Sequence, residues 1–375
     1  MDLEFTAEQE LLRDAVRGVC GKHATLDVAR QMEGDQLGYP EQLWTQLSET
    51  GLLGLTLPER WGGSGMSMLD AIVVYEELGR ALAPSPHFVS SVMSGGVIAL
   101  AGTDEQRDRW LPPIASGEVV MTPAWLEPGR GFGPLGVQLS ASSDGDGWRL
   151  SGTKRHVEYA GAADRLLVLA RCGEASDGVV LLLVDPSADG VSLHRQATVA
   201  SDHQCRVDFD AVHVPADAVV GAPGDGWSVW EQVMGDGIVL LAAQAVGGAR
   251  YALDITVQYA KDRFQFDKPL GAFQAIAHYL ADAVTRVDGA ETLVWEAAWA
   301  RSTGRSTASL APMAKLFACQ TFRDVTAMAQ QVFGGVGFTV EYDIQLYFRR
   351  AKQLQLSWWD SRYLEELVAA EMLDR

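Results

Sequence analysis

Residues 260–282, AKDRFQFDKPLGAFQAIAHYLAD, decide how the C-terminal part of the chain is interpreted, because one long helix is expected to end here and another to begin. Pro269 forces a turn between the two helices, since proline cannot continue a helix. Arg263 and Gln265 follow the first helix, and Gln274 opens the second. An arginine at a helix end, with amides and a helix N-terminus beside it, suits a pyrophosphate. A surface arginine beside an ordinary turn fits the same residues equally well.

A glycine-rich turn, QVFGGVG, stands further along at residues 331–337. Gln331 precedes three glycines, of which Gly334 and Gly335 are adjacent. Glycines permit positive φ and let a backbone approach a ligand closely. A helix C-cap followed by a turn explains Gly334 and Gly335 just as well, so the motif alone is weak evidence for a binding site.

Both stretches belong to a segment with helical periodicity throughout. Residues 237–264 predict a long helix rich in small residues, in which Gly247 and Gly248 would let another helix pack closely. Two further long helices are expected at 273–302 and 308–332.

The chain before this segment consists of two parts with different sequence patterns. Residues 1–118 show helical periodicity, with capped helix starts at Thr6, where Gln9 completes a capping box, and at Thr103. Residues 119–222 show short β-rich runs separated by turn clusters such as SSDGDG, which predict a compact antiparallel barrel or sandwich. The predicted fold class is therefore α+β, with helical, β and helical domains at 1–118, 119–222 and 223–375.

Composition excludes several classes of function. The 375 residues carry a net charge of −19, which argues against a nucleic-acid partner. The four cysteines are widely spaced, so we expect no zinc or other metal site and no disulfide framework. We expect no signal peptide at the N-terminus and no apolar run of the roughly 20 residues that a membrane helix needs. These features predict a cytoplasmic protein.

Four stretches together resemble one known family. They are RFQFDKPLGAFQAIAHYLAD, QVFGGVGFTVEYDIQLYFRRAK, GLLGLTLPERWGGSGMSMLDAIVVYEELGRA and LSGTKRHVEYAGAADRLLVLAR. They strongly resemble the acyl-CoA dehydrogenase family of flavoproteins, and the resemblance runs in order from about residue 5 to residue 370. It implies an N-terminal helical domain, a central antiparallel β-barrel or sandwich domain and a C-terminal four-helix bundle.

The resemblance also implies a cofactor and its contacts. Members of that family bind FAD between the β domain and the C-terminal helical domain, and a neighbouring subunit holds part of each FAD. By position, the residues implied to contact FAD across the subunit interface are Arg263, Gln265, Phe266, Phe273 and Gln274. The implied turn over the ADP part contains Gln331, Val332, Phe333, Gly334 and Gly335. The strand implied to lie against the isoalloxazine contains His156, Val157 and Glu158, and the implied loop at the middle of the flavin runs from Leu126 to Phe132.

The sequence departs from the family where the catalytic base is expected. In the family a Glu, six residues after the Lys of an R-A-K element, abstracts the α-proton of an acyl-CoA thioester while hydride leaves the β-carbon. Here the residue six after Lys352 is Trp358, whose indole cannot take that proton. Some relatives place the Glu on the long helix, where this chain has Gly237. The chain departs from the family at other positions too. Leu126 stands where the family has Thr, and Phe132 stands where it has Ser. HVE at 156–158 replaces the family's W-I-T, and Ile238 replaces a common Arg.

Two acidic residues are candidate bases. Asp236 adjoins Gly237, and Asp360 lies two residues beyond Trp358. A base must reach its proton within hydrogen-bond distance, and one step along a helix rotates a side chain by about 100°. The competing interpretation makes both residues helix N-caps, Asp236 within GDGI and Asp360 ahead of SRYLEELVAAEML.

Three functions fit these observations. The first is an FAD-dependent oxidoreductase that desaturates the α,β bond of an acyl-CoA as one subunit of a heteromeric enzyme. The ending FRRAKQLQLSWWDSRYLEELVA resembles the base-lacking subunit of such bacterial pairs, whose usual acyl groups are polycyclic or branched. The second is a homo-oligomeric flavoenzyme with altered chemistry or a carrier-bound or non-CoA substrate. The third is a non-catalytic structural partner, against which the retained Arg263, Gln265, Gln274 and Gln331 weigh.

The resemblance implies partners as well. They are an acyl-CoA or acyl-thioester substrate, further subunits in a homo- or heterotetramer built as a dimer of dimers, and an electron acceptor such as an electron-transfer flavoprotein. The implied role is in lipid metabolism.

Overall fold

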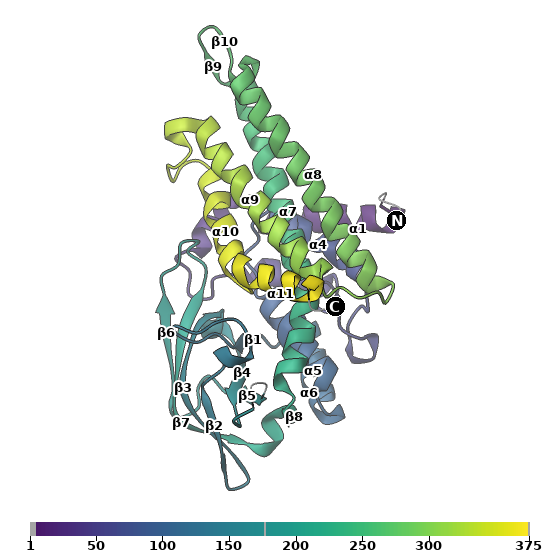
Figure 1. Ribbon diagram of the computed structural model, residues 1–375, viewed down its shortest axis with the longest axis vertical. Coiled ribbons are helices and arrows are strands. Elements are labelled where there is room, and N and C mark those ends of the chain that lie inside the picture. Colours follow the sequence, from purple (N-terminus) through teal and green to yellow (C-terminus); the bar gives the residue numbers. More distant parts are fainter. Residues whose placement is uncertain (1–4, 176–177, 374–375) are drawn as a thin grey trace. The chain divides into compact units, whose positions relative to one another are not determined.

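The computed structural model describes residues 5–175 and 178–373 (Figure 1). It divides into two compact units, each assembled from separate stretches of the chain. The first, here called the helical unit, comprises Met1–Ala29, Ser67–Ala83 and Ile238–Arg375. The second, the sheet unit, comprises Arg30–Met66 and Pro84–Gly237. This division follows compactness, whereas the predicted boundaries at 118 and 222 follow the chain, and those boundaries stay a prediction.

The helical unit consists of helices and one small hairpin. Its elements are α1 (Ala7–His23), α4 (Met68–Arg80), α7 (Gly226–Asp262) from Ile238 onward, β9 (Phe264–Gln265), β10 (Lys268–Pro269), α8 (Gln274–Ser302), α9 (Leu310–Phe333), α10 (Ile344–Leu356) and α11 (Ser361–Leu373). The predicted helices at 273–302 and 308–332 are confirmed. α1 begins at the predicted capping box, where Gln9 N donates to Thr6 Oγ1 over 3.2 Å and Thr6 N donates to Gln9 Oε1 over 3.1 Å.

Two glycines of α7 allow the close helix packing that the sequence predicts. A Cβ added at Gly247 would lie 1.8 Å from the carbonyl oxygen of Glu76 on α4. One added at Gly248 would lie 2.5 Å from the ring of Phe322 on α9. α7 can therefore approach α4 and α9 this closely only because these positions carry no side chain. α8 packs on α9, and α9 packs on α10 and α11, which gives the helical bundle of the predicted fold class.

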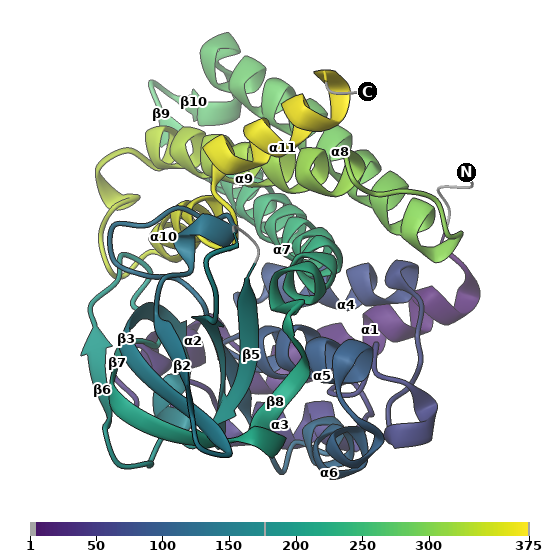
Figure 2. The ribbon, with the colours of Figure 1, turned by 60° about the horizontal axis from the view of Figure 1, so that its bottom comes forward.

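The sheet unit is built around eight strands. They are β1 (Met121–Ala124), β2 (Ser140–Asp144), β3 (Gly147–Glu158), β4 (Arg165–Arg171), β5 (Val179–Val184), β6 (Val191–Gln196), β7 (Gln204–Pro215) and β8 (Val219–Gly224). The strand order is β6-β7-β3-β2-β4-β5-β8, with β1 also paired to β4. Figure 2 shows β6, β7, β3, β2, β5 and β8 of this sheet. Most pairs are antiparallel, as predicted, but β1 and β2 each pair with β4 in parallel. The long stretch between β1 and β4 provides the crossover that a parallel pair requires.

The core of the sheet unit is formed by the inward-facing side chains of these strands. Leu150 of β3, Val168 of β4, Leu182 of β5 and Val207 of β7 are all fully buried in it. The helices of this unit are α3 (Glu41–Glu49), the π-helix η2 (Phe88–Ser94), α5 (Gly95–Ala101) and α6 (Asp104–Ala115), and α2 (Leu26–Met32) spans the division between the units. α6 begins at the predicted Thr103 cap.

α7 corrects one expectation drawn from the sequence. By length and composition this helix could cross a membrane, so the expectation that no apolar run reaches that length is wrong. Its apolar window is 72% buried inside the protein, which is the pattern of a core helix.

Candidate functional site

The loop that follows β1 is fixed by a buried ion pair. Lys154 on β3 is fully buried, and its Nζ donates to Glu127 Oε1 over 2.7 Å and to Trp125 O over 3.1 Å. The same carboxylate oxygen accepts the backbone N–H groups of Gln138 and Leu139, each over 2.8 Å. Three donors therefore converge on one oxygen, and the loop is held at that point by protein groups alone.

Sequence reasoning missed this anchor. A single lysine in a strand pattern gives no local signal, and its partner Glu127 lies 27 positions away in the chain. Burial lowers the pKa of Lys154 from 10.5 to about 8, while the neighbouring Glu127 carboxylate acts in the opposite direction. The carboxylate thus favours the charged form of an ammonium that burial alone would neutralise.

β3 carries the three residues implied to face the flavin, and a β-bulge redirects one of them. The pairing of β3 with β7 shifts register between Lys154 and Val157, and His156 within this bulge has a φ of 54°. The His156 N–H donates to Gln196 Oε1 over 2.8 Å, and its ring Nδ1 lies 2.7 Å from Gln204 Oε1. The imidazole is exposed and yet held in one orientation.

The neighbouring residues show how the predicted loop and strand meet. Val157 is 1% exposed and belongs to the sheet core, so only its backbone is available to a ligand. Glu158 is half-buried, and its carbonyl accepts the Thr122 hydroxyl over 2.6 Å. Arg155 N donates to Leu126 O over 2.9 Å, which places the loop directly beside the strand. Within the described residues, Arg155 Nε is buried without a hydrogen-bond partner.

In the helical unit, the first implied FAD residues lie on an exposed hairpin. Arg263 and Gln265 stand on its first half, and Phe266 and Asp267 form its tip with φ values of 52° and 62°. Phe266 is 85% exposed. Arg263 is exposed, and it forms no ion pair among the residues that the structure describes. Phe264 on the same hairpin is 59% exposed, and contiguous exposed apolar groups of this kind mark interaction sites when they form a large patch.

The start of α8 closes against this hairpin. The rings of Phe266 and Phe273 pack edge to face with their centroids 6.3 Å apart, and Leu270 N donates to Arg263 O over 2.8 Å. Gln274 is the first residue of α8 and is exposed. The structure thus brings together the residues that the opening stretch of sequence singled out.

The glycine turn is open to solvent and lies beside the end of α7. α9 ends at Phe333, and Gly334 follows with a φ of 65°. A Cβ added at Gly334 or Gly335 would meet nothing within 4 Å, so the backbone there is accessible. Tyr259 of α7 stacks on Phe333 with a centroid distance of 4.2 Å, which sets the α7 end beside the turn. Gln331 is exposed on the last turn of α9.

The donor chemistry of these residues fits a phosphate-bearing cofactor such as FAD. The fit rests on an arginine without a carboxylate partner in the described chain, an accessible glycine backbone, and exposed amides at Gln265, Gln274 and Gln331. Those of these groups that lie on the hairpin are exposed to solvent, as the residues of a site that a second subunit completes would be.

Trp358, which the family resemblance aligns with the catalytic base, stands in a turn with left-handed backbone. Trp358 and Trp359 have φ values of 53° and 69°, and they are 5% and 3% exposed. Lys315 of α9 is fully buried beneath the turn, and its Nζ donates to Leu354 O over 3.1 Å and to Ser357 O and Trp359 O over 2.9 Å each. Sequence reasoning missed this lysine as well, because no local pattern marks it.

Gly237, which the family resemblance aligns with an alternative base position, is closely packed by its neighbours. A Cβ added at Gly237 would lie 2.8 Å from Met93 Sδ and 3.3 Å from the Phe88 ring. A side chain at this position would therefore require both neighbours to move.

The N-cap interpretation has a different outcome for each of the two candidate bases. Asp236 lies well inside α7, which begins at Gly226, so its interpretation as an N-cap is wrong. Asp360 does cap a helix, because its Oδ1 accepts Tyr363 N over 2.9 Å at the start of α11. A catalytic role for either residue stays a prediction.

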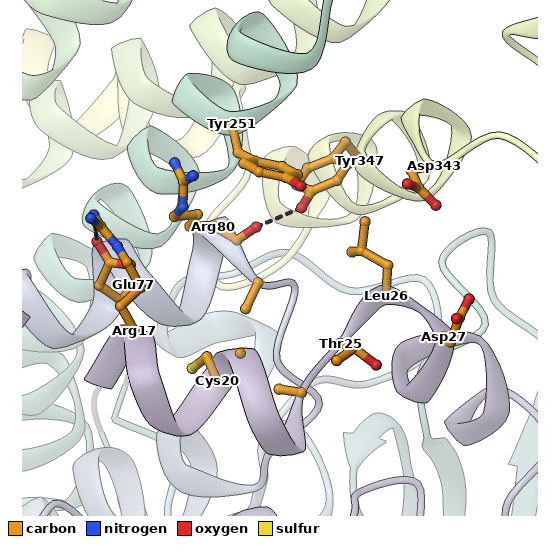
Figure 3. A pocket seen from close by; sticks show the side chains of 13 residues that line it. Arg17, Cys20, Thr25, Leu26, Asp27, Glu77, Arg80, Tyr251, Asp343 and Tyr347 are labelled. Atoms are coloured by element: carbon orange, nitrogen blue, oxygen red, sulfur yellow. Dashed lines mark hydrogen bonds and ion pairs between the residues drawn. The ribbon is translucent and has the colours of Figure 1, made fainter. Parts of the chain in front are cut away.

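α10 leads into the tryptophan turn, and a cavity of about 450 Å³ lies beside its first turn (Figure 3). Tyr347 of α10 donates its hydroxyl to Arg80 O over 2.5 Å, and its ring centroid lies 5.4 Å from that of Tyr251. Across the cavity, Arg17 binds Glu77 through both Nε and Nη2, over 2.9 and 2.6 Å. The contacts of Tyr347 hold the first turn of α10 on α4 and α7, and Lys315 binds the other end of α10.

Comparison with known proteins agrees with this arrangement. Three family models match in order along the chain, namely the acyl-CoA dehydrogenase N-terminal, middle and C-terminal domains, over residues 6–118, 123–212 and 224–371. A Bacillus subtilis protein named probable acyl-CoA dehydrogenase YngJ is 31% identical, and the match covers 100% of both chains.

Two solved structures are similar over nearly the whole chain. One, described as a variant of the Tcur3481-Tcur3483 steroid ACAD, is 34% identical with a TM-score of 0.87, and the match covers 98% of each chain. The other is the ChsE4-ChsE5 complex from Mycobacterium tuberculosis, which is 27% identical with a TM-score of 0.90 over 100% of both chains. The chain therefore belongs to the acyl-CoA dehydrogenase family, whose members are flavoprotein oxidoreductases that act on CH–CH groups of acyl-CoA.

Proposed function

We propose that this chain binds FAD and takes part in the α,β-desaturation of an acyl-CoA thioester as one subunit of a heteromeric enzyme, in which another chain provides the base. The observation that carries the proposal is Trp358, which stands where the family has its Glu. Gly237 supports it, because the second known base position carries no carboxylate and packs closely against the side chains of Met93 and Phe88. Two similar solved structures carry the names of paired chains, which favours a heteromer further.

The part of the reaction proposed for this chain is to hold the cofactor. FAD, when bound, accepts the hydride that leaves the β-carbon of the substrate. Arg263 would pair with the pyrophosphate, and the backbone at Gly334 and Gly335 would lie along the ADP part. His156 would pack on the ring system, oriented by Gln204.

The α-proton needs a different acceptor. An indole offers no basic lone pair, so Trp358 cannot take the proton. In this proposal a carboxylate of the second subunit removes it as the hydride departs, and the carbon–carbon double bond forms. The tetramer would then be a dimer of two unlike pairs. Its electron acceptor would be an electron-transfer flavoprotein, and its acyl group would be polycyclic or branched, as the steroid named for one similar structure favours.

The carboxylates of this chain provide the test. In the complex formed with the product of the neighbouring gene, Asp236→Asn and Asp360→Asn should each retain full turnover. Asparagine is also a good N-cap, so Asp360→Asn preserves the start of α11. A loss of turnover in either variant, with flavin content unchanged, would place the base in this chain and overturn the proposal. It would favour the homo-oligomeric flavoenzyme with altered chemistry instead.

A further inference from the structure

Lys315 forms an unusual cap at the end of α10. The last carbonyl groups of a helix have no partner within the helix. Here the backbone cap supplies only one donor, the Ser357 N–H, which donates to the Gln353 carbonyl oxygen. The ammonium of Lys315 binds Leu354 O and then continues to Ser357 O and Trp359 O, at 3.1, 2.9 and 2.9 Å. An ammonium has three donors, so these three carbonyl groups match its whole capacity.

The turn that these carbonyl groups belong to is strained. Two consecutive bulky residues, Trp358 and Trp359, adopt φ values of 53° and 69°, where glycine is the ordinary choice. Trp359 Nε1 adds to the cost, because it is buried with no hydrogen-bond partner within the described residues. Such a conformation persists only where the surroundings hold it in place.

The charges around the turn are arranged to hold it. Burial lowers the pKa of Lys315, and the neighbouring Cys319 thiol and the Asp360 carboxylate oppose this effect. The Asp360 carboxylate in turn accepts the Tyr363 N–H at the start of α11. A cationic group therefore binds the turn from α9, and an anionic group fixes its far end to the next helix.

We propose that Lys315 is the positioning residue for side chain 358. By binding Leu354 O, Ser357 O and Trp359 O, it holds the turn at residues 357–359, with its two left-handed tryptophans, and so determines where the residue at the base position lies. The inference rests on the proposed function only in identifying residue 358 with that position.

The test compares two lysines of the same unit. Lys315→Met keeps the length of the side chain but cannot donate. Lys352→Met is the matched control, because Lys352 Nζ makes a single hydrogen bond to Gln355 Oε1 over 3.0 Å on α10. The full-length chain, alone or with its partner, is labelled with 5-fluorotryptophan. The fluorine resonances of Trp358 and Trp359 are identified by their loss in Trp358→Phe and Trp359→Phe.

In Lys315→Met, these two resonances should shift or broaden while those of the other tryptophans stay in place. Hydrogen exchange of residues 357–363 should accelerate at least about tenfold, and exchange in α8 should not change. Lys352→Met should change neither. If Lys315→Met does not fold, Lys315→Gln, which keeps N–H donors without the charge, should shift the same two resonances. Unmoved resonances of Trp358 and Trp359, or equal changes at all tryptophans, would overturn the inference.

This measurement requires neither substrate nor partner. A negative result would therefore leave the proposed heteromeric function untouched. Conversely, a homo-oligomeric enzyme would contradict the proposed function without affecting the role of Lys315.

Discussion

The carboxyl group of Glu76 on α4 lies buried in the helical unit, with its Oε1 accepting the indole N–H of Trp295 on α8 over 3.2 Å. Burial raises the pKa of Glu76 from 4.5 to about 8; Glu291 adds to the rise, and the bond from Trp295 opposes it. Glu76 therefore keeps its proton in the folded chain at pH values where an exposed glutamate has lost it.

This shift makes stability depend on pH. Because the folded pKa lies above the unfolded value, the contribution of Glu76 is complete below pH 4.5 and is lost as the pH rises through about 8. Glu76→Gln keeps the acceptor and never ionises, so it should match the wild type near pH 4.5 and be more stable by about 4 kcal/mol at pH 8. Urea unfolding at both pH values measures this, with the exposed Glu366→Gln as control. Equal stability of Glu76→Gln and wild type at pH 8 would contradict it.

Gly247 should tolerate no side chain. The Cβ of Gly247→Ala would lie 1.8 Å from the Glu76 carbonyl oxygen, so α4 and α7 would have to separate. We expect a loss of about 1–3 kcal/mol or more in the free energy of unfolding. Gly235→Ala on the same helix is the control, because its Cβ would meet nothing within 4 Å and alanine favours a helix by about 1 kcal/mol. Similar effects of the two substitutions would show that helix propensity, and not packing, controls the first position.

The pair formed by Glu127 and Lys154 should stabilise the sheet unit only as a pair. Glu127→Gln leaves a buried ammonium without its counter-charge and should cost about 3 kcal/mol. Adding Lys154→Met should recover part of that loss, since no charge then remains buried. The exposed Glu118→Gln tests for effects of net charge alone. Additive losses in the double variant, measured by chemical unfolding, would show that the two side chains do not depend on one another.

Much of the fold follows from local sequence signals. The Thr6 and Thr103 capping boxes, the two long C-terminal helices and the β-rich middle segment all depend on residues near one another in the chain. The predicted start of the helix at Gly237 is wrong, because GDG resembles a helix break in the sequence. In the structure α7 begins at Gly226 and continues through Gly237, against which Met93 and Phe88 pack directly. α6, which begins at the predicted Thr103 cap, continues through Pro112 and Pro113 and ends at Ala115.

The site is only partly readable from sequence, for a similar reason. Motif positions single out Arg263, Gln274 and the glycine turn as candidates, because each stands at a helix end that the local sequence marks. Lys154 and Lys315 are different, since each binds groups at least 27 positions away in the chain. A buried lysine becomes recognisable only once the fold shows which carbonyl or carboxylate groups surround it.

The role of Arg263 in cofactor binding can be tested directly. Arg263→Ala removes a guanidinium that has no carboxylate partner among the described residues, so any loss of flavin arises from the lost contact with the cofactor. We expect flavin affinity in the assembled enzyme to fall by about tenfold or more, as for a lost charged hydrogen bond. Arg362→Ala is the control, because Arg362 pairs with Glu366 on the surface of α11. Unchanged flavin content in Arg263→Ala would be evidence against the assignment.

The visible spectrum of the purified chain tests the central claim, that this chain is the base-lacking subunit of a heteromer, most directly. We predict no flavin band when the chain is produced alone, and a flavin band when it is produced together with the product of the neighbouring gene. The complex should then bleach with an acyl-CoA substrate. A yellow homotetramer of this chain alone that bleaches with an acyl-CoA would contradict the claim, because that chain would then contain a base of its own.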